Sequence, residues 1–314
     1  MIRGSAVFPI VALVYALADG LAARQEPAPR FATNTALVRL EVSVFKANGP
    51  VKGLRDSDFE VSDAGVPIKG FSVQALVDRP IDIALVTQSF RSLHGEQVMR
   101  FRETVSSLVS APSAEDRLAI TVASAPPMSP RLLLPGKWHG DPAVLNGSDE
   151  AALWDAVGIA LLSFPPSDRA NAVIVVADGI DRRSVVTPAM VARLAARLRA
   201  QIVFIGSAGT LIRGFKVRSV PGGSPSSPKL ETMALIGNAF PSPELRSLAR
   251  DTGGQVIDII DRAPARLVGD LLMQLRSGYV ISYPGIGPKG WHAVTVRVRD
   301  RSAMVATRAG YFVD

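Results

Sequence analysis

A short, unbroken apolar run near residue 80 constrains the fold more than any other feature of the sequence. Residues 83–86 read Ile-Ala-Leu-Val and lead through Thr87 into a polar stretch. Such a run is typical of a strand buried on both faces of a parallel sheet. In the segment that follows, apolar residues recur at helical spacing over residues 98–109. The sequence therefore predicts a strand, a polar loop and a helix, with the loop at the carboxyl end of the strand, where open α/β sheets bind ligands.

Strands and helices continue to alternate up to residue 276. The pattern predicts strands at 82–87, 117–123, 131–134, 172–177, 201–206 and 255–260, and helices at 95–110, 150–163, 188–200, 243–251 and 263–276. Such alternation indicates an α/β fold with a doubly wound, mostly parallel sheet. The run at 131–134 follows 117–123 too closely for a helical crossover, so we expect an antiparallel edge strand there.

A period of two appears at both ends of the chain instead. Apolar and polar residues alternate over residues 38–45 and 292–299, and Gly/Pro turns bound a further short strand at 68–73. We expect these strands to form one small antiparallel β-sandwich into which the α/β domain is inserted. The predicted parts are a signal peptide at 1–23, a linker at 24–34, N-terminal strands at 35–78, the α/β domain at 79–277 with a long Gly/Ser/Pro-rich loop at 207–242, and C-terminal strands at 278–314.

Residues 1–23 have the pattern of a secretory signal peptide. Arg3 precedes an apolar stretch at 6–16 that only Pro9 interrupts, and small residues at 16–18 and 21–23 are cleavage candidates. The stretch is shorter than the roughly 20 residues that span a bilayer. We predict a cleaved signal and export to the periplasm, the cell surface or the exterior, with an uncleaved membrane anchor as the alternative. No later segment predicts a transmembrane helix.

Charge and cysteine content exclude several classes of site. The chain has no cysteine, which excludes disulfides, thiolate metal sites and a cysteine nucleophile. Its net charge is +7, but the 35 Lys and Arg residues are scattered, with no run of five. Without a basic and aromatic ribbon or a recognition motif, we expect no nucleic-acid partner.

Several short motifs occur in a family-specific order. They are Val51-Lys52-Gly53-Leu54, Asp58-Phe59-Glu60-Val61, the strand at 82–87, Ala152-Leu153-Trp154-Asp155-Ala156, Ala177-Asp178-Gly179, Gly278-Tyr279-Val280 and Arg308-Ala309-Gly310-Tyr311-Phe312. In this order the chain resembles the von Willebrand factor A-related domain family of acidobacterial type, over residues 35–314. The resemblance implies a Rossmann-like domain flanked by β-strands and a role in protein–protein interaction.

The resemblance also implies a metal-ion-dependent adhesion site. Such sites carry Asp-x-Ser-x-Ser after the first strand, a Thr in a second loop and an Asp in a third, which together give a hard cation such as Mg²⁺ its oxygen ligands. Here Thr87 replaces the first Asp, Ser89 is kept, Arg91 replaces the second Ser, Ala151 stands at the Thr position and Asp178 is kept. We therefore expect a degenerate site without a cofactor, with Mg²⁺ bound by Ser89 and Asp178 as the alternative.

Arg91 allows two interpretations. In the first, its guanidinium replaces the metal ion, pairing with Asp178 or with a carboxylate of the partner. In the second, Arg91 points to solvent and Asp178 caps the segment that follows it. The predicted binding residues are Ser89, Arg91 and Asp178.

The remaining polar and aromatic candidates predict no catalytic site. We interpret His94, His139 and His292 as solvated loop residues, and Asp56 and Asp58 as turn and capping residues. The sequence contains no Gly-x-Ser-x-Gly elbow, His-Glu-x-x-His motif or Walker loop.

The tryptophans divide between core and surface. Trp154 lies among apolar residues at helical spacing and is predicted to be in the core, whereas Trp138 and Trp291 lie near turns, where either is a candidate interface anchor.

These features together predict an exported, non-enzymatic protein–protein interaction module of adhesion or scaffold type that needs no metal ion. An unknown protein partner would bind the loops at 87–95, 145–151, 178–187 and 207–242. Two alternatives stay open: a Mg²⁺-dependent adhesin with unusual ligands, and an enzyme with an unrecognised site.

Overall fold

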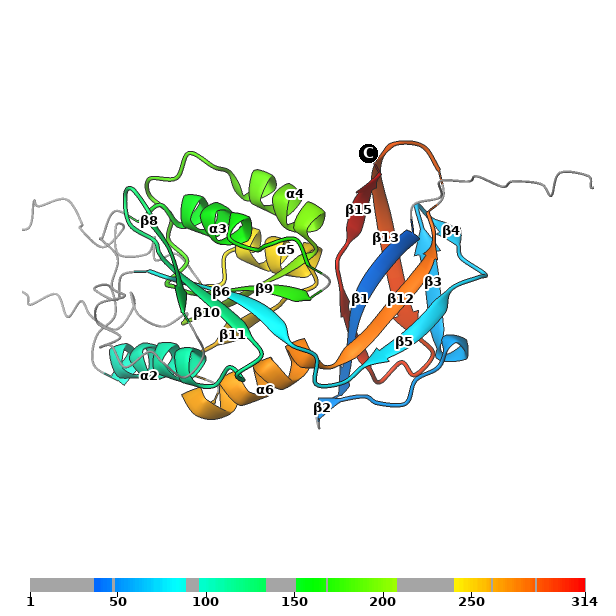
Figure 1. Ribbon diagram of the computed structural model, residues 1–314, viewed down its shortest axis with the longest axis horizontal. Helices are drawn as coiled ribbons and strands as arrows, with labels where there is room; N and C mark the ends of the chain where they lie inside the picture. The colour runs from blue at the N-terminus through cyan, green and yellow to red at the C-terminus, as the bar shows by residue number, and fades with distance from the viewer. Residues whose placement is uncertain are drawn as a thin grey trace, which may run out of the picture. The chain divides into compact units, whose positions relative to one another are not determined.

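The computed structural model describes residues 37–46, 49–88, 96–133, 151–167, 169–207, 240–260, 262–285 and 287–313. They lie within one unit, Leu37–Asp314, which contains an α/β part and a β-sandwich (Figure 1). The predicted signal peptide and linker, and most of the predicted loop at 207–242, lie outside the described residues.

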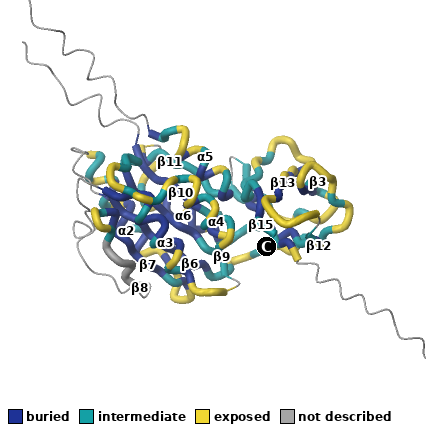
Figure 2. Tube along the Cα trace, turned by 90° about the horizontal axis from the view of Figure 1, so that it is seen from above, coloured by how far each residue is buried: buried dark blue, intermediate teal, exposed yellow. Residues whose placement is uncertain are grey.

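A six-stranded sheet forms the centre of the α/β part. Its strands are β6 (Ile81–Thr87), β7 (Arg117–Val122), β8 (Met128–Leu133), β9 (Ala170–Val176), β10 (Ala200–Gly206) and β11 (Val256–Asp258). They are ordered β11-β10-β9-β6-β7-β8, which is the doubly wound order with a reversal beside the first strand. All pairs are parallel except β7 with β8, so the predicted antiparallel edge strand is confirmed. The central strands are buried along most of their length (Figure 2).

Helices cover both faces of this sheet. On one face α2 (Glu96–Ser110) and α6 (Pro264–Arg276) pack on Ile83, Leu85 and their neighbours, and on the other face α3 (Leu153–Leu162), α4 (Pro188–Leu198) and α5 (Pro243–Asp251) pack on Ala84 and Val86. Trp154 lies in the second of these cores, as predicted. No helix in the described ranges is long and apolar enough to cross a membrane.

The β-sandwich uses strands from both ends of the chain. One sheet contains β1 (Leu37–Lys46), β5 (Ser72–Leu76), β12 (Gly278–Pro284) and β14 (Met304–Thr307), with β2 (Gly49–Pro50) added to β1; the other contains β3 (Phe59–Asp63), β4 (Val66–Pro67), β13 (Gly290–Val298) and β15 (Gly310–Val313). Apolar residues of both sheets meet in one core. The α/β part enters after β5 and returns to β12, so the predicted insertion is confirmed.

The strand predicted at 68–73 is wrong in its position. The Ile68 amide donates to the Val61 carbonyl at 2.9 Å, so this residue extends the pairing of β4 with β3. Pairing with β12 begins only at Ser72 and gives β5 its bounds, Ser72–Leu76. The predicted stretch is thus divided between the two sheets of the sandwich, because each part follows a different partner strand.

Backbone contacts also join the α/β part to the sandwich. The Ala309 amide donates to the Asp251 carbonyl at 2.8 Å, and Thr252 forms an antiparallel bridge with Arg308. The half-buried guanidinium of Arg308 donates to the Arg39 carbonyl at 2.8 Å. Burial lowers the pKa of Arg308, and nearby Arg199 lowers it further. The end of α5 therefore meets the strands of the sandwich directly.

Candidate functional site

The carboxyl edge of the parallel sheet is the position at which the sequence places the site. Thr87, the last residue of β6, is 0% exposed, and its carbonyl accepts from the Ala123 amide at 2.7 Å. The next residue, Gln88, donates through Nε2 to the Ile180 carbonyl at 2.7 Å. This side chain connects the end of β6 to the loop that follows β9.

Asp178 lies in a tight turn directly after β9. Its Oδ1 accepts from the Ile180 amide at 3.0 Å. Gly179 has φ +79°, and a Cβ atom on it would lie 2.7 Å from Leu245 Cδ1. A side chain at residue 179 is therefore disfavoured by backbone conformation and by contact with α5.

The rest of this loop caps helix α3. Asp181 Oδ1 accepts from the Leu153 amide at 2.7 Å, and Ser184 Oγ accepts from the Trp154 amide at 2.9 Å. Ala152, the N-cap residue that precedes the helix, offers no side-chain acceptor. The backbone amides at the start of the helix, which have no acceptor within the helix, thus donate to side chains about 30 positions away. The loop and the helix hold each other in place.

A cavity of about 210 Å³ lies beside this turn. Its lining combines the carboxylates of Asp178, Asp181 and Glu244 with the aromatic rings of Trp154 and Phe240. The Glu244 carboxylate is at the N-terminus of α5, where its own backbone amide and Ser242 lower its pKa. The carboxyl edge therefore has an acidic hollow with apolar walls.

Of the three predicted binding residues, the structure describes only Asp178. Asp178 lies at the carboxyl edge, and its bond to the Ile180 amide is of the kind expected if it caps the following segment. Ser89 and Arg91 lie outside the described residues, as do His94, His139 and Trp138. A pairing of Arg91 with Asp178 therefore stays a prediction.

The described donors at this edge do not fit a magnesium site. Of the positions that the resemblance assigns to the metal, Thr87 is buried in the sheet, Ala151 has no side-chain oxygen and Asp178 supplies one carboxylate. No group of three or more His, Cys, Asp or Glu residues that could hold a metal ion occurs among the described residues. Mg²⁺ requires near-octahedral oxygen ligands, which this set does not supply.

Sequence reasoning missed the roles of Gln88, Asp181 and Ser184. The segment 178–181, Asp-Gly-Ile-Asp, gives a local signal for a turn, but the partners of these side chains lie on other elements. The contact of Gln88 with Ile180, and those of Asp181 and Ser184 with the start of α3, reveal that these side chains hold the edge in place.

The interpretation of His292 as a solvated loop residue is wrong. His292 lies in β13, is 4% exposed, and places Nδ1 3.1 Å from Asp63 Oδ1. Its ring stacks on Tyr311 with the centroids 5.2 Å apart. The alternation of β13 directs this side chain into the sandwich, where Asp63 supplies its polar partner. Asp56 and Asp58, in contrast, form the predicted turn, a short 3₁₀ helix in which Asp58 accepts from the Arg55 amide.

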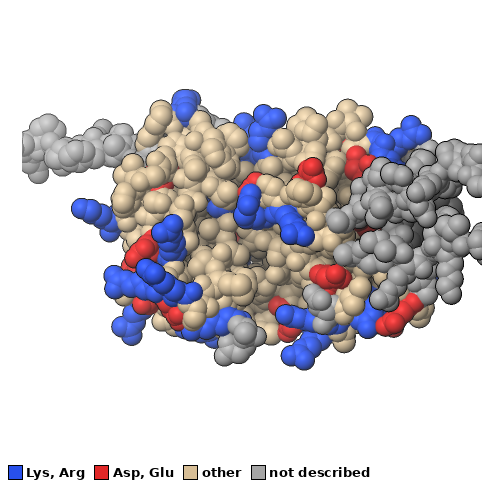
Figure 3. Space-filling model, turned by 180° about the vertical axis from the view of Figure 1, so that it is seen from behind, with Lys and Arg blue, Asp and Glu red and all other residues tan. Residues whose placement is uncertain are grey.

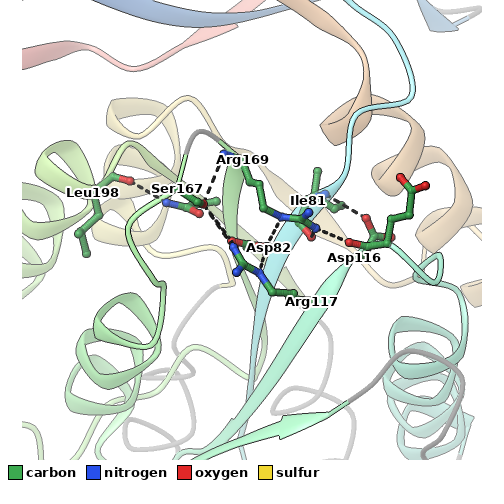
Figure 4. Close-up of polar contacts among 9 residues, drawn as sticks. Ile81, Asp82, Asp116, Arg117, Ser167, Arg169 and Leu198 are labelled. Atoms are coloured by element: carbon green, nitrogen blue, oxygen red, sulfur yellow. Dashed lines mark hydrogen bonds and ion pairs between the residues drawn. The ribbon is translucent and has the colours of Figure 1, made fainter.

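A second polar cluster closes the opposite, amino edge of the sheet (Figure 4). The side chain of Asp82 is 3% exposed and binds Arg117 and Arg169, each through Nε at 2.7 Å. Asp116 accepts from the Ile81 amide at 3.0 Å and pairs with Arg276. Burial raises the pKa of Asp116, but its bonds to Ile81, Arg276 and Ser113 outweigh that effect and lower it. The carboxylates and arginines of this cluster pair with one another and connect the starts of the strands. At the carboxyl edge, in contrast, carboxylates lie beside a cavity.

The strand order and the helices on both faces define the class of the α/β part. It is a von Willebrand A-like domain set into a β-sandwich, which confirms the fold implied by the sequence motifs. No family model matches the sequence, and no curated protein matches it.

Solved structures with a similar fold come from several organisms. They include an aerotolerance-related membrane protein of Bacteroides fragilis with multiple mutations to serine (14% identity, 62% of this chain and 98% of that chain, TM-score 0.44) and the conserved hypothetical protein BatB of Bacteroides thetaiotaomicron (16%, 62% and 98%, TM-score 0.43). A von Willebrand factor type A protein of Catenulispora acidiphila has 14% identity over 90% of this chain and 75% of its own, with a TM-score of 0.38. At these identities and TM-scores no conclusion about this chain is drawn from the likeness.

Proposed function

We propose that the protein is an exported, non-enzymatic interaction module of adhesion or scaffold type that binds a protein partner at the carboxyl edge of its parallel sheet. The observation that carries this proposal is the cavity beside Asp178, which has acidic and aromatic walls. It is bounded by a loop whose side chains hydrogen-bond to the start of α3. A preformed hollow on a braced edge suits recognition of a partner's side chains, because little ordering is needed on binding.

The proposal includes binding without a metal ion. Thr87 and Ala151 are the support for this, since Thr87 lacks the carboxylate and Ala151 lacks the hydroxyl that the adhesion site of the family has at these positions. Export is supported by the signal-peptide pattern at residues 1–23, and the non-enzymatic role by the lack of nucleophile, zinc and phosphate-loop motifs in the sequence.

The proposal is tested by comparing how the wild type, a variant at the carboxyl edge and a variant elsewhere on the surface capture a partner protein. The chain from Arg24 is immobilised and exposed to an envelope extract of the source cells, with EDTA or with Mg²⁺. Asp178→Arg introduces a cation into the cavity, whereas Glu103→Arg makes the same change on the exposed face of α2. We expect the wild type and Glu103→Arg to retain the same protein with EDTA, and Asp178→Arg to lose it.

Three results would count against the proposal. Loss of capture with EDTA would favour the Mg²⁺-dependent adhesin instead. Equal capture by Asp178→Arg and Glu103→Arg would move the binding surface away from this edge. Turnover of a substrate in a broad hydrolase screen, abolished by Asp178→Arg alone, would favour an enzyme.

A further inference from the structure

A second, larger hollow lies between the α/β part and the sandwich. It has a volume of about 680 Å³ and is bounded by α4, α5, β13 and β15. Ala189, Ala192 and Ala196 line it from α4, and Trp291, Ala293 and Phe312 line it from the strands. We call this hollow the α4–α5 groove.

Small residues on one side and aromatic residues on the other give the groove its shape. The three alanines are spaced at i, i+3 and i+7 and therefore share one face of α4, where short side chains leave space. On the strand side the rings of Trp291 and Phe312 meet edge to face with centroids 4.9 Å apart. A Cβ atom on Gly310 would lie 2.5 Å from Trp291 Cζ2, so glycine there lets the indole lie over β15.

Trp291 remains 47% exposed although it is the largest apolar side chain of the groove. Tryptophan beside a hollow is typical of the residues that contribute most to binding at protein interfaces. This residue was a candidate anchor from its sequence position, and the structure adds the groove beside it.

The α4–α5 groove adjoins the cavity at the carboxyl edge. Pro188 and Glu244 line both hollows, so the two meet at the start of α4 and α5. The 11 residues of α4 extend over about 16 Å at 1.5 Å per residue. An extended peptide rises about 3.3 Å per residue, and about five residues would therefore follow the helix.

The lining of the two hollows is acidic although the whole chain is basic. Asp178, Asp181, Glu244 and Asp251 contribute carboxylates, and Arg193 is the one cation among the lining residues. The Asp251 carboxylate also pairs with Arg250 beside the groove, at 3.3 Å, so the excess of negative charge lies mainly with Asp178, Asp181 and Glu244. The chain as a whole has a net charge of +7. On the face shown in Figure 3, Lys and Arg form several separate groups with acidic residues between them. A local excess of carboxylates in such a chain favours a positively charged ligand segment.

We propose that the α4–α5 groove and the adjoining cavity bind one extended segment of the partner protein that is both basic and apolar. An aromatic or aliphatic side chain of this segment packs against the exposed indole of Trp291, because Arg197 already lies over the Phe312 ring, 5.7 Å from its centroid. A Lys or Arg side chain lies near Glu244, between the two hollows. This inference rests on the proposed function and specifies the chemistry of the partner.

Selection of random peptides tests this inference without knowledge of the partner. The probe is a phage-displayed library of nine-residue peptides, selected on the immobilised chain from Arg24. Ala192→Phe fills the groove, and Ala265→Phe makes the same change at an exposed position of α6 that does not line it. We expect wild type and Ala265→Phe to enrich peptides that carry Lys or Arg together with apolar residues, at least tenfold over Ala192→Phe.

The dissociation constant of one selected peptide, measured on further variants, then distinguishes the apolar contribution of Trp291 from the charged contribution of Glu244 and Asp251. Trp291→Ala should weaken binding at least tenfold at any salt concentration, because it removes apolar contact. The double variant Glu244→Gln/Asp251→Asn should weaken binding at low salt and make the affinity less dependent on salt, because screening acts on charge pairs. Thermal unfolding of each variant identifies any that has lost the fold.

Several outcomes would overturn the inference. The first is equal enrichment on Ala192→Phe and Ala265→Phe, and the second is enrichment of acidic peptides. The third is a dimer in sedimentation that only Ala192→Phe dissociates, because that result would assign the groove to a second copy of the chain. If Asp178→Arg abolishes capture of the envelope protein while Ala192→Phe does not reduce it, the proposed function stands and this inference alone fails.

Discussion

His292 shows at the scale of single residues how the sandwich holds a buried charge. Its Nε2 faces the Pro288 carbonyl at 2.8 Å and its Nδ1 faces Asp63, so both ring nitrogens meet acceptors. Asp63 also accepts from Tyr311 at 2.5 Å and from Tyr283 at 3.1 Å. A doubly protonated ring satisfies this arrangement, because an imidazolium donates from both nitrogens.

We expect this arrangement to make stability depend on pH. The hydrogen bond to Pro288 raises the pKa of His292 above 6.5, burial opposes this, and Asp63 raises it further. Stabilisation by a raised pKa is fully present below the unfolded value and is lost as pH rises through the folded value. The melting temperature should therefore fall more between about pH 6 and 9 in the wild type than in His292→Gln.

The tyrosines that surround Asp63 do not contribute to this pH dependence. Burial raises the pKa of both Tyr283 and Tyr311 above its ordinary value, and neither titrates in that range. Arg308, 5.9 Å from the Tyr311 ring, stays charged throughout. If the melting temperature changed with pH in the same way in the wild type and in His292→Gln, His292 would not be the group that causes the pH dependence.

The replaced metal ligands Thr87 and Ala151 lead to a prediction about divalent cations. A bound ion stabilises the folded state by about 2.7 kcal/mol at a hundredfold excess over its dissociation constant. Because the described donors do not fit such an ion, we expect the melting temperature to be the same in EDTA and in millimolar Mg²⁺, Mn²⁺ or Ca²⁺. A rise of several degrees with one of these ions would contradict the proposed metal-independent site.

At the scale of elements, Asp82 connects three strand starts at the amino edge. It lies in β6, Arg117 begins β7, and Arg169 immediately precedes β9. We expect Asp82→Ala to lower the free energy of unfolding by about 1.5–3 kcal/mol, because it removes a buried carboxylate that accepts hydrogen bonds from two partly exposed arginines. Urea unfolding measures this difference.

Asp270 provides the matched comparison for that substitution. Its side chain is 39% exposed and pairs with Arg262 at 2.9 Å on the surface of α6. Removal of such a pair costs about 0–1 kcal/mol. If Asp82→Ala and Asp270→Ala had the same small effect, the amino-edge cluster would not contribute to stability as its burial suggests.

Elements with strong local patterns could be predicted from the sequence, and contacts between distant elements could not. The buried runs at β6, β9 and β10 and the helical spacing in α2 and α6 are local signals, and the structure has these elements at the predicted places. The role of His292 depends on Asp63, which is 229 residues away. Likewise the groove beside Trp291 depends on α4, whose alanines appear in the sequence only as ordinary helix residues.

The candidate site divides in the same way. Asp178 could be placed at the carboxyl edge because it directly follows a buried strand. Its cavity could not be predicted, since Phe240 and Glu244 reach it from a segment some 60 residues later.

At the scale of the whole molecule, the sandwich depends on strands at the end of the chain. β12 pairs with both β1 and β5, and β13 pairs with β3. We expect a chain that ends at residue 277 to leave β5 unpaired, and β1 and β3 paired only with the two-residue strands β2 and β4, so that this region is open to proteases. Limited proteolysis followed by mass spectrometry should then find cleavage within residues 37–76 in the truncated chain and none there in the full chain. Protection of these residues after truncation would contradict the shared sandwich.

The pairing of Leu76 with Gly278 has a consequence for how such a protein can be rebuilt. These two residues lie directly opposite each other in the antiparallel ladder of β5 and β12, at the point where the chain leaves for the α/β part and returns from it. Antiparallel strands can be joined by a two-residue hairpin turn. We therefore expect that a short turn, or another domain with adjacent termini, can replace the α/β part at these two ends while the sandwich keeps all its strands.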